Sequence, residues 1–246
     1  MCNRATIQVS RYFMKIKGRG NLKNYGSKKD IFIFVLMGIT AVGITVSGIY
    51  TRQAVLNILP LYVSLVIGML QSRVNRFASL MGSLNSVLYG VVYIYFNLYG
   101  SALSALLFSC PIQLITFIRW SKNKRGSTTK LRKMTVGQRA LMAVGFCVLL
   151  LVLWWVLPLI GSEYVFLDSA TTLLGILIYF LTMFAFVEYP ILMIVNGIIN
   201  IVLYVTMLSE QPGIAPHLIF AVYSFVCILF AAFEAKRLYN LQQKEA

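Results

Sequence analysis

The chain has 246 residues, of which 59% are hydrophobic and only 12% charged, and its mean hydropathy is +0.79. Soluble domains carry charge on roughly a quarter of their residues, so this composition excludes a water-soluble globular protein and indicates a membrane protein. The net charge of +15 does not indicate nucleic-acid binding, because the basic residues gather in a few blocks between apolar runs and form no single patch.

The first 30 residues are polar and basic, with eight Lys or Arg before Ile31. They lack the short apolar region and the small-residue cleavage site of a secretory signal. We therefore expect a retained cytoplasmic segment at 1–30, followed by a first transmembrane helix at 31–50.

Seven more apolar runs follow, each near the 20 residues that cross about 30 Å of hydrocarbon. An even number of helices places both termini on one side, and most basic residues between the helices fall on the side of the basic N-terminus. The sequence thus predicts a multi-pass protein of the cell (cytoplasmic) membrane with both termini in the cytoplasm. The predicted helices are 31–50, 54–70, 77–97, 101–118, 139–158, 169–187, 189–208 and 217–234.

A basic stretch separates the fourth and fifth predicted helices, with eight Lys or Arg from Arg119 to Arg139. It is also rich in Ser, Thr and Gly, which predicts a cytoplasmic linker between two halves. The simpler interpretation is a solvated loop touching anionic lipid headgroups, and docking of a specific partner is the alternative. The predicted organisation is a basic N-terminus (1–30), an additional helix (31–50), a first three-helix bundle (54–120), the linker (121–138), a linking helix (139–160), a second three-helix bundle (168–235) and a cytoplasmic tail (236–246).

The two halves share a sequence string. Gly82-Ser-Leu-Asn85-Ser-Val-Leu-Tyr89 matches Gly197-Ile-Ile-Asn200-Ile-Val-Leu-Tyr204, and both read G-x-x-N-x-V-L-Y, 115 residues apart. The copies lie four helices apart, so they cross the membrane in the same direction. This predicts a parallel repeat of two three-helix bundles about an axis along the membrane normal.

Amide and phenol side chains recur inside the predicted helices. Polar groups in hydrocarbon cost free energy unless they are paired, so these residues should face the bundle interior or a water-filled cavity. Asn85 and Tyr89 share a helix face, and the same holds for Asn196, Asn200 and Tyr204. Two such stripes meeting near the midplane would form a pocket that hydrogen-bonds hydroxyls or an amide, while aromatic rings cover a flat or apolar face.

The alternative reading of these residues is structural. Asn85, Asn200 and Gln113 would then hydrogen-bond between helices and hold them together. In that case Gly82 and Gly197 would serve to let helix backbones approach closely.

The groups needed for catalysis or active coupling are missing from the predicted spans. Within these spans the only Asp, Glu, Lys or Arg are Arg139 and Glu234, each at the end of a span, and the chain has no G-x-x-x-x-G-K-[ST] loop. The single histidine, His217, starts a helix and suits the membrane interface, and the four cysteines lack metal-site spacing. We expect no enzyme activity, catalytic residue, metal or cofactor, and passive transport is the simplest mechanism. Asp168 should cap the helix that it precedes, with a substrate contact as the alternative.

Four strings resemble the PnuC family of nicotinamide riboside transporters. They are the FASLMGSLNSVLYG run at 77–90, NLYGSALSALLFSCPIQLITFIRW at 97–120, FLDSATTLLG at 166–175 and EYPILMIVNGIINIVLY at 188–204. The resemblance covers roughly residues 55–240. It implies an all-α membrane fold of two parallel three-helix bundles joined by a linking helix, like the SWEET sugar transporters, here with an extra N-terminal helix.

The resemblance also implies site residues. In the family two tryptophans flank the flat base of the substrate; here Tyr189 and Leu192 stand in their places, while the Asn that follows them is kept as Asn196. A Gln usual in the preceding helix corresponds to Tyr179. These departures remove part of the base-stacking surface. The residues carried over as substrate-binding are Asn85, Tyr89, Gln113, Tyr179, Tyr189, Asn196, Asn200 and Tyr204.

The resemblance implies facilitated transport of a nicotinamide riboside-like, nucleoside or deoxynucleoside solute, which a cytosolic kinase traps inside by phosphorylation. The resemblance further implies a homo-oligomer, a trimer, in the lipid bilayer. Two alternatives stay open: transport of a vitamin such as thiamine or riboflavin, and a non-transporting capture subunit that needs an energising partner.

Overall fold

The computed structural model describes residues 28–125, 127–160 and 165–244. Most of the predicted basic N-terminus and the last two residues of the predicted tail lie outside these ranges. The chain divides into two units, Met1–Ile39 and Thr40–Ala246. Within the first unit the described residues, 28–39, are helical and begin the apolar helix Lys28–Tyr50.

The second unit is almost entirely helical. Among the described residues eight helices are long and apolar enough to cross a membrane, which confirms the predicted all-α architecture of a multi-pass membrane protein. After Lys28–Tyr50 the elements are α2 (Val55–Ser72), α3 (Phe77–Tyr95), α4 (Tyr99–Leu103), the π-helix η1 (Ser104–Ser109), α5 (Cys110–Lys122), β1 (Lys124–Arg125), β2 (Thr128–Thr129), α6 (Val136–Val156), the 3₁₀ helix η2 (Leu157–Ile160), α7 (Val165–Met183), α8 (Tyr189–Leu208), the 3₁₀ helix η3 (Pro212–Ile214) and α9 (Ala215–Lys244).

Three helices differ from their predicted extents. The fourth span contains a π-helix, η1, immediately before Pro111. Because Pro111 has no N–H to bond the carbonyl four residues earlier, the α-helical pattern is interrupted there. Helix α7 begins at Val165 and so includes Asp168, which we had placed outside the span. Helix α9 runs on to Lys244, so most of the predicted tail is helical.

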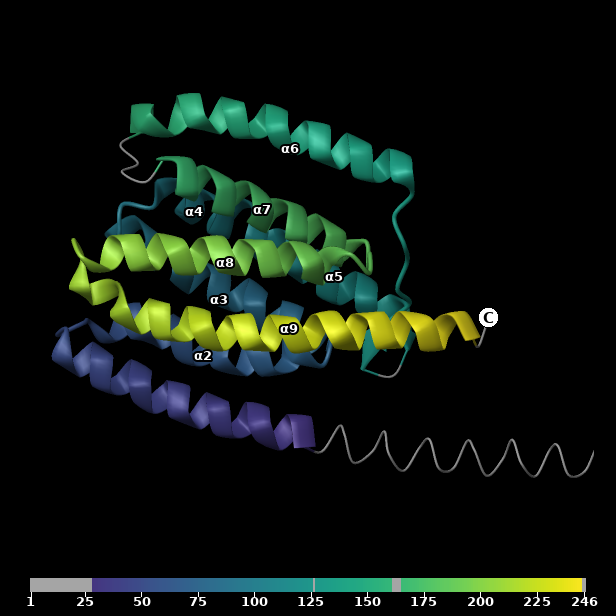
Figure 1. Cartoon of the computed structure of the whole chain (residues 1–246), viewed down its shortest axis with the longest axis horizontal. Coiled ribbons are helices and arrows are strands. Elements are labelled where there is room, and N and C mark those ends of the chain that lie inside the picture. Colours follow the sequence, from purple (N-terminus) through teal and green to yellow (C-terminus); the bar gives the residue numbers. More distant parts are fainter. Residues whose placement is uncertain (1–27, 126, 161–164, 245–246) are drawn as a thin grey trace, which may run out of the picture. The chain divides into compact units, whose positions relative to one another are not determined.

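Six helices form a closed ring in the order α2, α3, α5, α7, α8 and α9. Figure 1 shows these helices from the side, with α6 beyond α7. Two contacts join the halves of the chain: α5 packs against α7, and α9 packs against α2. Helix α6 lies outside the ring against α7, and none of its residues is buried. The ring thus has an interior, and α6 connects its halves from outside.

Helices α2 and α7 end in the same kind of turn. The N–H groups of Val74 and Asn75 bond the carbonyls of Gln71 and Leu70, which is the pattern of a Schellman motif. After α7, Ala185 takes the place of Val74 in an equivalent pair of bonds. Val74 and Ala185 both have positive φ, 52° and 57°, a conformation that favours glycine.

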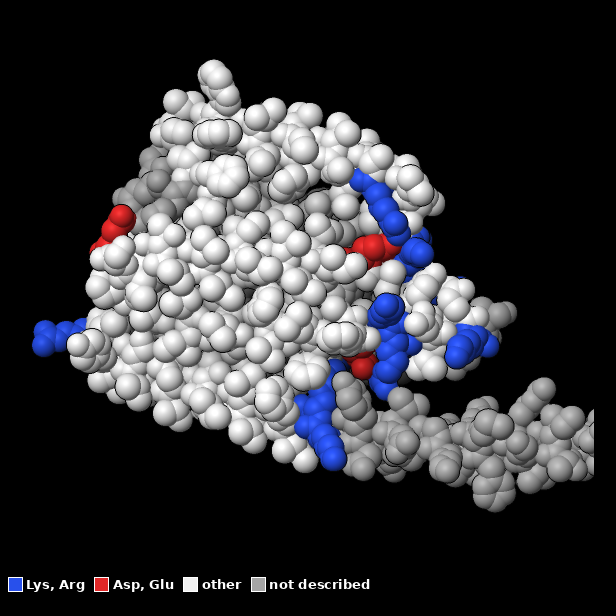
Figure 2. All heavy atoms as spheres, in the orientation of Figure 1, with Lys and Arg blue, Asp and Glu red and all other residues white. Residues whose placement is uncertain are grey.

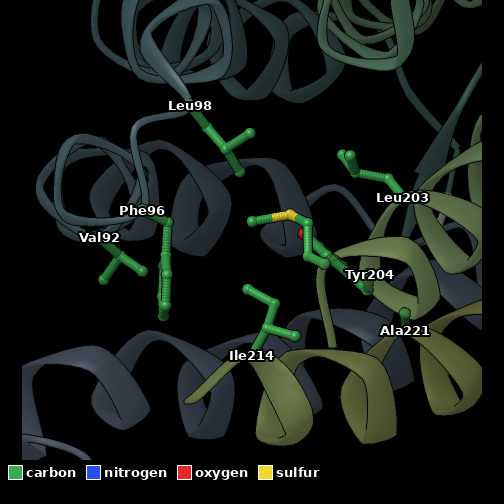
Figure 3. Close-up of a cluster of buried hydrophobic side chains, with 8 residues drawn as sticks. Val92, Phe96, Leu98, Leu203, Tyr204, Ile214 and Ala221 are labelled. Atoms are coloured by element: carbon green, nitrogen blue, oxygen red, sulfur yellow. The ribbon is translucent and has the colours of Figure 1, made fainter. Parts of the chain in front are cut away.

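Buried hydrophobic clusters fill both ends of the ring. The cluster at the end away from the linker, which we call the far cluster, joins α3, α8 and α9 with the segments before α4 and α9, as Figure 3 shows. The linker cluster lies at the other end and joins both Schellman turns to α5, α9 and the linker. The far cluster consists of Val92, Phe96, Leu98, Leu203, Tyr204, Met207, Ile214 and Ala221, and the linker cluster of Val74, Trp120, Leu131, Ala185 and Ala235.

The linker is not the solvated loop that its composition suggests. Between α5 and α6 it forms a two-residue hairpin, Lys124–Arg125 with Thr128–Thr129, and then pairs through Arg132 with the backbone of Ala185 and Val187. Thr128, Thr129, Leu131 and Met134 are buried. Sequence reasoning missed this order because the stabilising partners lie on distant helices.

Charge separates strongly along the molecule. Figure 2 shows most of the Lys and Arg on this face at the end that holds the linker, beside a broad face free of charge. The exposed large side chains of the spans are apolar, as on α6, where Leu141, Val148 and Trp155 are more than half exposed. Such a surface suits contact with lipid, with the basic residues at one membrane boundary.

Candidate functional site

The ring encloses one main cavity, with a volume of about 290 Å³, lined by all six ring helices. All eight residues predicted to bind substrate lie on its wall. The structure therefore brings together residues from α3, α5, α7 and α8 that are far apart in the sequence. They are Asn85, Tyr89, Gln113, Tyr179, Tyr189, Asn196, Asn200 and Tyr204.

Asn85 on α3 is held by α2. Its amide nitrogen donates to the Pro60 carbonyl (3.0 Å) and to the Ser64 hydroxyl (2.7 Å), and Ser64 donates to the phenol oxygen of Tyr89 (3.0 Å). The amide oxygen of Asn85 is buried and has no partner among the described residues. Asn85 thus holds helices together through its nitrogen and offers an unused acceptor through its oxygen.

Gln113 on α5 is held by two hydroxyls. Its amide nitrogen donates to Ser109 (2.6 Å) and Ser86 (3.1 Å), and these hydroxyls also bond each other (2.6 Å). The amide oxygen lies against Gly82, where an added Cβ would overlap it. Gly82 is therefore required for the position of Gln113. The π-helix η1 ends at Ser109 and so determines where the Ser109 hydroxyl lies relative to Gln113.

In the second half of the chain, the amide side chains of Asn196 and Asn200 are held by fewer hydrogen bonds. The amide nitrogen of Asn200 donates only to the carbonyl of Asn196 on its own helix (2.9 Å), and the amide oxygen of Asn196 is buried without a partner among the described residues. Gly197 lies beneath Phe225, at 3.0 Å from the site of an added Cβ, and Ile228 lies nearby. The two copies of the G-x-x-N string therefore differ: amides and hydroxyls surround the first, and aromatic and aliphatic groups the second.

Aromatic side chains form much of the wall. Tyr89 stacks on Tyr93, with ring centroids 5.4 Å apart. Tyr204 joins the wall to the far cluster, and Trp120 joins it to the linker cluster. Sequence reasoning missed Tyr93, although it follows Tyr89 by one turn on the same face. It also missed Ser64, Ser86, Ser109 and Phe225, since serine and phenylalanine in an apolar helix carry no distinctive pattern.

No Asp, Glu, Lys, Arg or His belongs to the cavity wall among the described residues. The part of the chain that the structure describes also contains no group of three His, Cys, Asp or Glu that could hold a metal ion. The wall presents amide oxygens, hydroxyls and rings, which bind a ligand by hydrogen bonds and stacking.

The carboxylate of Asp168 is buried, but its role differs from the predicted one. It accepts hydrogen bonds from the backbone N–H groups of Gly100 and Ser101, both at 3.2 Å, and from the Ser101 hydroxyl at 2.6 Å. Asp168 therefore caps the N-terminus of α4 and not that of its own helix. The prediction failed because its partners come from the other half of the chain.

His217 is also displaced from its predicted environment. It is 2% exposed and contacts the rings of Phe96 and Tyr204 edge-on, with centroids 5.3 and 6.2 Å away. Neither ring nitrogen has a hydrogen-bond partner among the described residues. His217 is thus part of the packing around the far cluster and not an interfacial side chain.

Comparison with known proteins gives two matches. The sequence profile of the family described as "Nicotinamide mononucleotide transporter" matches residues 54–236, which include α2 to α8 and most of α9 and exclude the helix Lys28–Tyr50. The fold is similar to the "Crystal structure of the Vitamin B3 transporter PnuC", with a TM-score of 0.72 over 86% of this chain and 92% of that chain, at 21% sequence identity. A comparison with curated proteins found no match.

Proposed function

Because this chain belongs to the nicotinamide mononucleotide transporter family, a family of membrane transporters and not of enzymes, we propose that its own solute is a riboside without a phosphate group. A nicotinamide riboside-like compound, a nucleoside or a deoxynucleoside fits this description. The observation that carries the proposal is the uncharged, amide- and tyrosine-lined cavity at the centre of the ring.

The absence of Lys and Arg from the described cavity wall argues against a phosphorylated solute. Burying a phosphate removes its hydration, and a wall without Lys or Arg supplies no countercharge. The partnerless amide oxygens of Asn85 and Asn196 match the hydroxyl or amide donors of a riboside. Tyr89, Tyr93 and Tyr189 offer ring faces for a flat base.

We propose passive transport. Asp168 is a buried carboxylate within a span, but three donors already bind it, so it acts as a helix cap and not as a coupling site. A passive carrier accumulates solute only when the solute is consumed inside, which requires a cytosolic kinase that phosphorylates the riboside. The basic linker end would face the cytoplasm of a cell membrane, with both termini on that side.

We further propose a homo-oligomer, a trimer, as the assembled form. Helix α6 packs mainly against α7 and η2 and leaves much of its apolar surface exposed outside the ring. Size-exclusion chromatography with light scattering in a mild detergent measures the protein mass and tests this state.

The direct test of function is solute flux into vesicles containing the purified protein. We expect uptake of labelled nicotinamide riboside or a nucleoside, no uptake of nicotinamide mononucleotide, and no dependence on an imposed proton or sodium gradient. Uptake of the mononucleotide at an equal rate would refute the choice of solute. Tight binding without flux would identify a capture subunit, and transport of thiamine or riboflavin alone would identify a vitamin carrier.

A further inference from the structure

The segment of residues 127–135, which we call the strap, crosses the linker end of the ring. At its start the Ser127 carbonyl accepts from the backbone N–H of Arg76, between α2 and α3. Farther along, Arg132 pairs with the backbone of the turn between α7 and α8. The strap therefore contacts both halves of the chain at the end of the ring where Val74, Asn75 and Trp120 line the cavity.

One face of the strap is anchored in the linker cluster. Leu131 is 3% exposed and packs with Val74, Trp120 and Ala235. Val74 and Trp120 also line the cavity, so the strap lies directly behind its wall. The Trp120 ring N–H donates to the Thr182 carbonyl at 2.9 Å, which connects α5 to α7 beneath the strap.

Polar bonds hold the strap at two further points. Gln242 on α9 accepts from the backbone N–H of Leu131 (2.9 Å) and donates to the carbonyl of Thr129 (3.0 Å). Glu188, at the start of α8, accepts from the N–H of Met134 (3.1 Å) and forms an ion pair with Arg139 (2.7 Å). Each of these two points rests on a single side chain, in addition to the backbone bonds at Ser127 and Arg132.

The opposite face of the strap is suited to water. Lys130, Arg132 and Lys133 are exposed, and they alternate with the buried Thr129, Leu131 and Met134. A detached strap would therefore expose few apolar groups, and its cations would keep it in the aqueous phase.

Two positions beneath the strap, Val74 and Ala185, have a backbone conformation in which glycine would be less strained. Val74 and Ala185 have positive φ, which costs a β-branched residue such as valine more than glycine. Both side chains fill the linker cluster under Leu131.

We propose that the strap is the gate at the linker end: it closes the cavity when Leu131 is seated and must lift for solute to pass between the cavity and the water on that side. This inference rests on the proposed transport function. It predicts that flux, and not solute binding, requires movement of residues 127–135 away from α9.

A reversible crosslink tests the proposal. Gln242 bonds the backbone on both sides of the exposed Lys130, so Lys130→Cys with Gln242→Cys allows the strap to be joined to α9 by a thiol crosslinker. The four native cysteines, Cys2, Cys110, Cys147 and Cys227, are first replaced by Ser or Ala, and flux of this background is measured. The matched control is Lys236→Cys with Asn240→Cys, two exposed positions one turn apart on α9 that do not touch the strap.

We expect a cleavable bifunctional maleimide to lower vesicle uptake at least tenfold in the strap pair, with recovery after cleavage, and to leave the control pair unchanged. Thermal stabilisation by the solute should persist in the crosslinked strap pair. Undiminished flux in fully crosslinked protein, verified by mass spectrometry, would overturn the proposal. Absence of flux in the unmodified protein would instead count against the proposed function.

A second measurement covers the case in which the paired variant does not fold. In Leu131→Cys the thiol is buried while the strap is seated, whereas in Lys130→Cys it is always exposed. We expect a water-soluble maleimide to modify Leu131→Cys several-fold faster during solute exchange than without solute, and Lys130→Cys at one rate throughout. A Leu131→Cys thiol that stays unmodified over many transport cycles would overturn the gate.

Discussion

The Ser101 hydroxyl donates a hydrogen bond of 2.6 Å to the carboxylate of Asp168, 67 residues away in the sequence. This bond and two backbone N–H bonds fasten the start of α4 to α7, at the end opposite the strap. The two halves of the chain are thereby joined near the far cluster by a buried anion.

Replacing Asp168 by Asn should destabilise the protein. The amide keeps the size of the side chain but loses the charge that three donors satisfy, at a cost of about 2 kcal/mol. We expect a lower melting temperature in detergent, with Ser101→Ala giving a smaller decrease. Glu210→Gln, an exposed acid near the same end, is the control and should melt within a degree or two of the unmodified protein. Equal melting of Asp168→Asn and the unmodified protein would show that the cap is not stabilising.

Asn85 and Asn200 should respond differently to alanine, although they occupy equivalent positions of the shared string. Asn85 bonds α2 through Pro60 and Ser64, so Asn85→Ala should cost about 1–3 kcal/mol of stability as well as solute binding. Asn200 bonds only its own helix, so Asn200→Ala should melt normally and still lose binding. Melting curves with and without solute separate the two effects. Normal binding by Asn200→Ala would remove it from the site.

Gly82→Ala should disable the site through Gln113. The added methyl group would overlap the Gln113 amide oxygen and force that side chain away from Ser86 and Ser109. We expect solute affinity to fall at least tenfold, measured by isothermal titration. Gly145→Ala on α6, where nothing lies within 4 Å of the new carbon, is the matched control and should bind normally. Normal affinity in both variants would place Gln113 outside the binding site.

His217→Leu should leave the protein equally stable or make it more stable. The imidazole is buried against Phe96 and Tyr204, and neither nitrogen has a hydrogen-bond partner among the described residues. Burying such a group without a bond costs free energy, which an apolar side chain of similar size avoids. Melting temperature and vesicle flux should both be maintained. A loss of flux without a loss of stability would assign His217 a role in transport.

Hydropathy alone was enough to predict the eight helices, because the length of an apolar run is set by the thickness of the bilayer. The positions of Asn85, Gln113 and Asn200 on the cavity wall could also be predicted from the sequence, since isolated amides in hydrocarbon must face inward. The roles of Asp168 and of the strap could not be predicted in this way. The carboxylate is bonded by Ser101 and the strap by Gln242, and both partners are distant in the sequence. A local sequence pattern does not predict a hydrogen bond between distant segments.

The order in which the ring closes bears on how the protein is made. Helix α2 packs against α9, so the second span to be synthesised has no permanent neighbour on one side until the last span enters the membrane. Until then the polar groups of Ser64 and Asn85 on the inner wall are not yet enclosed by the completed ring. A chain that stops before α9 would leave this polar wall without the helix that closes the ring between α8 and α2.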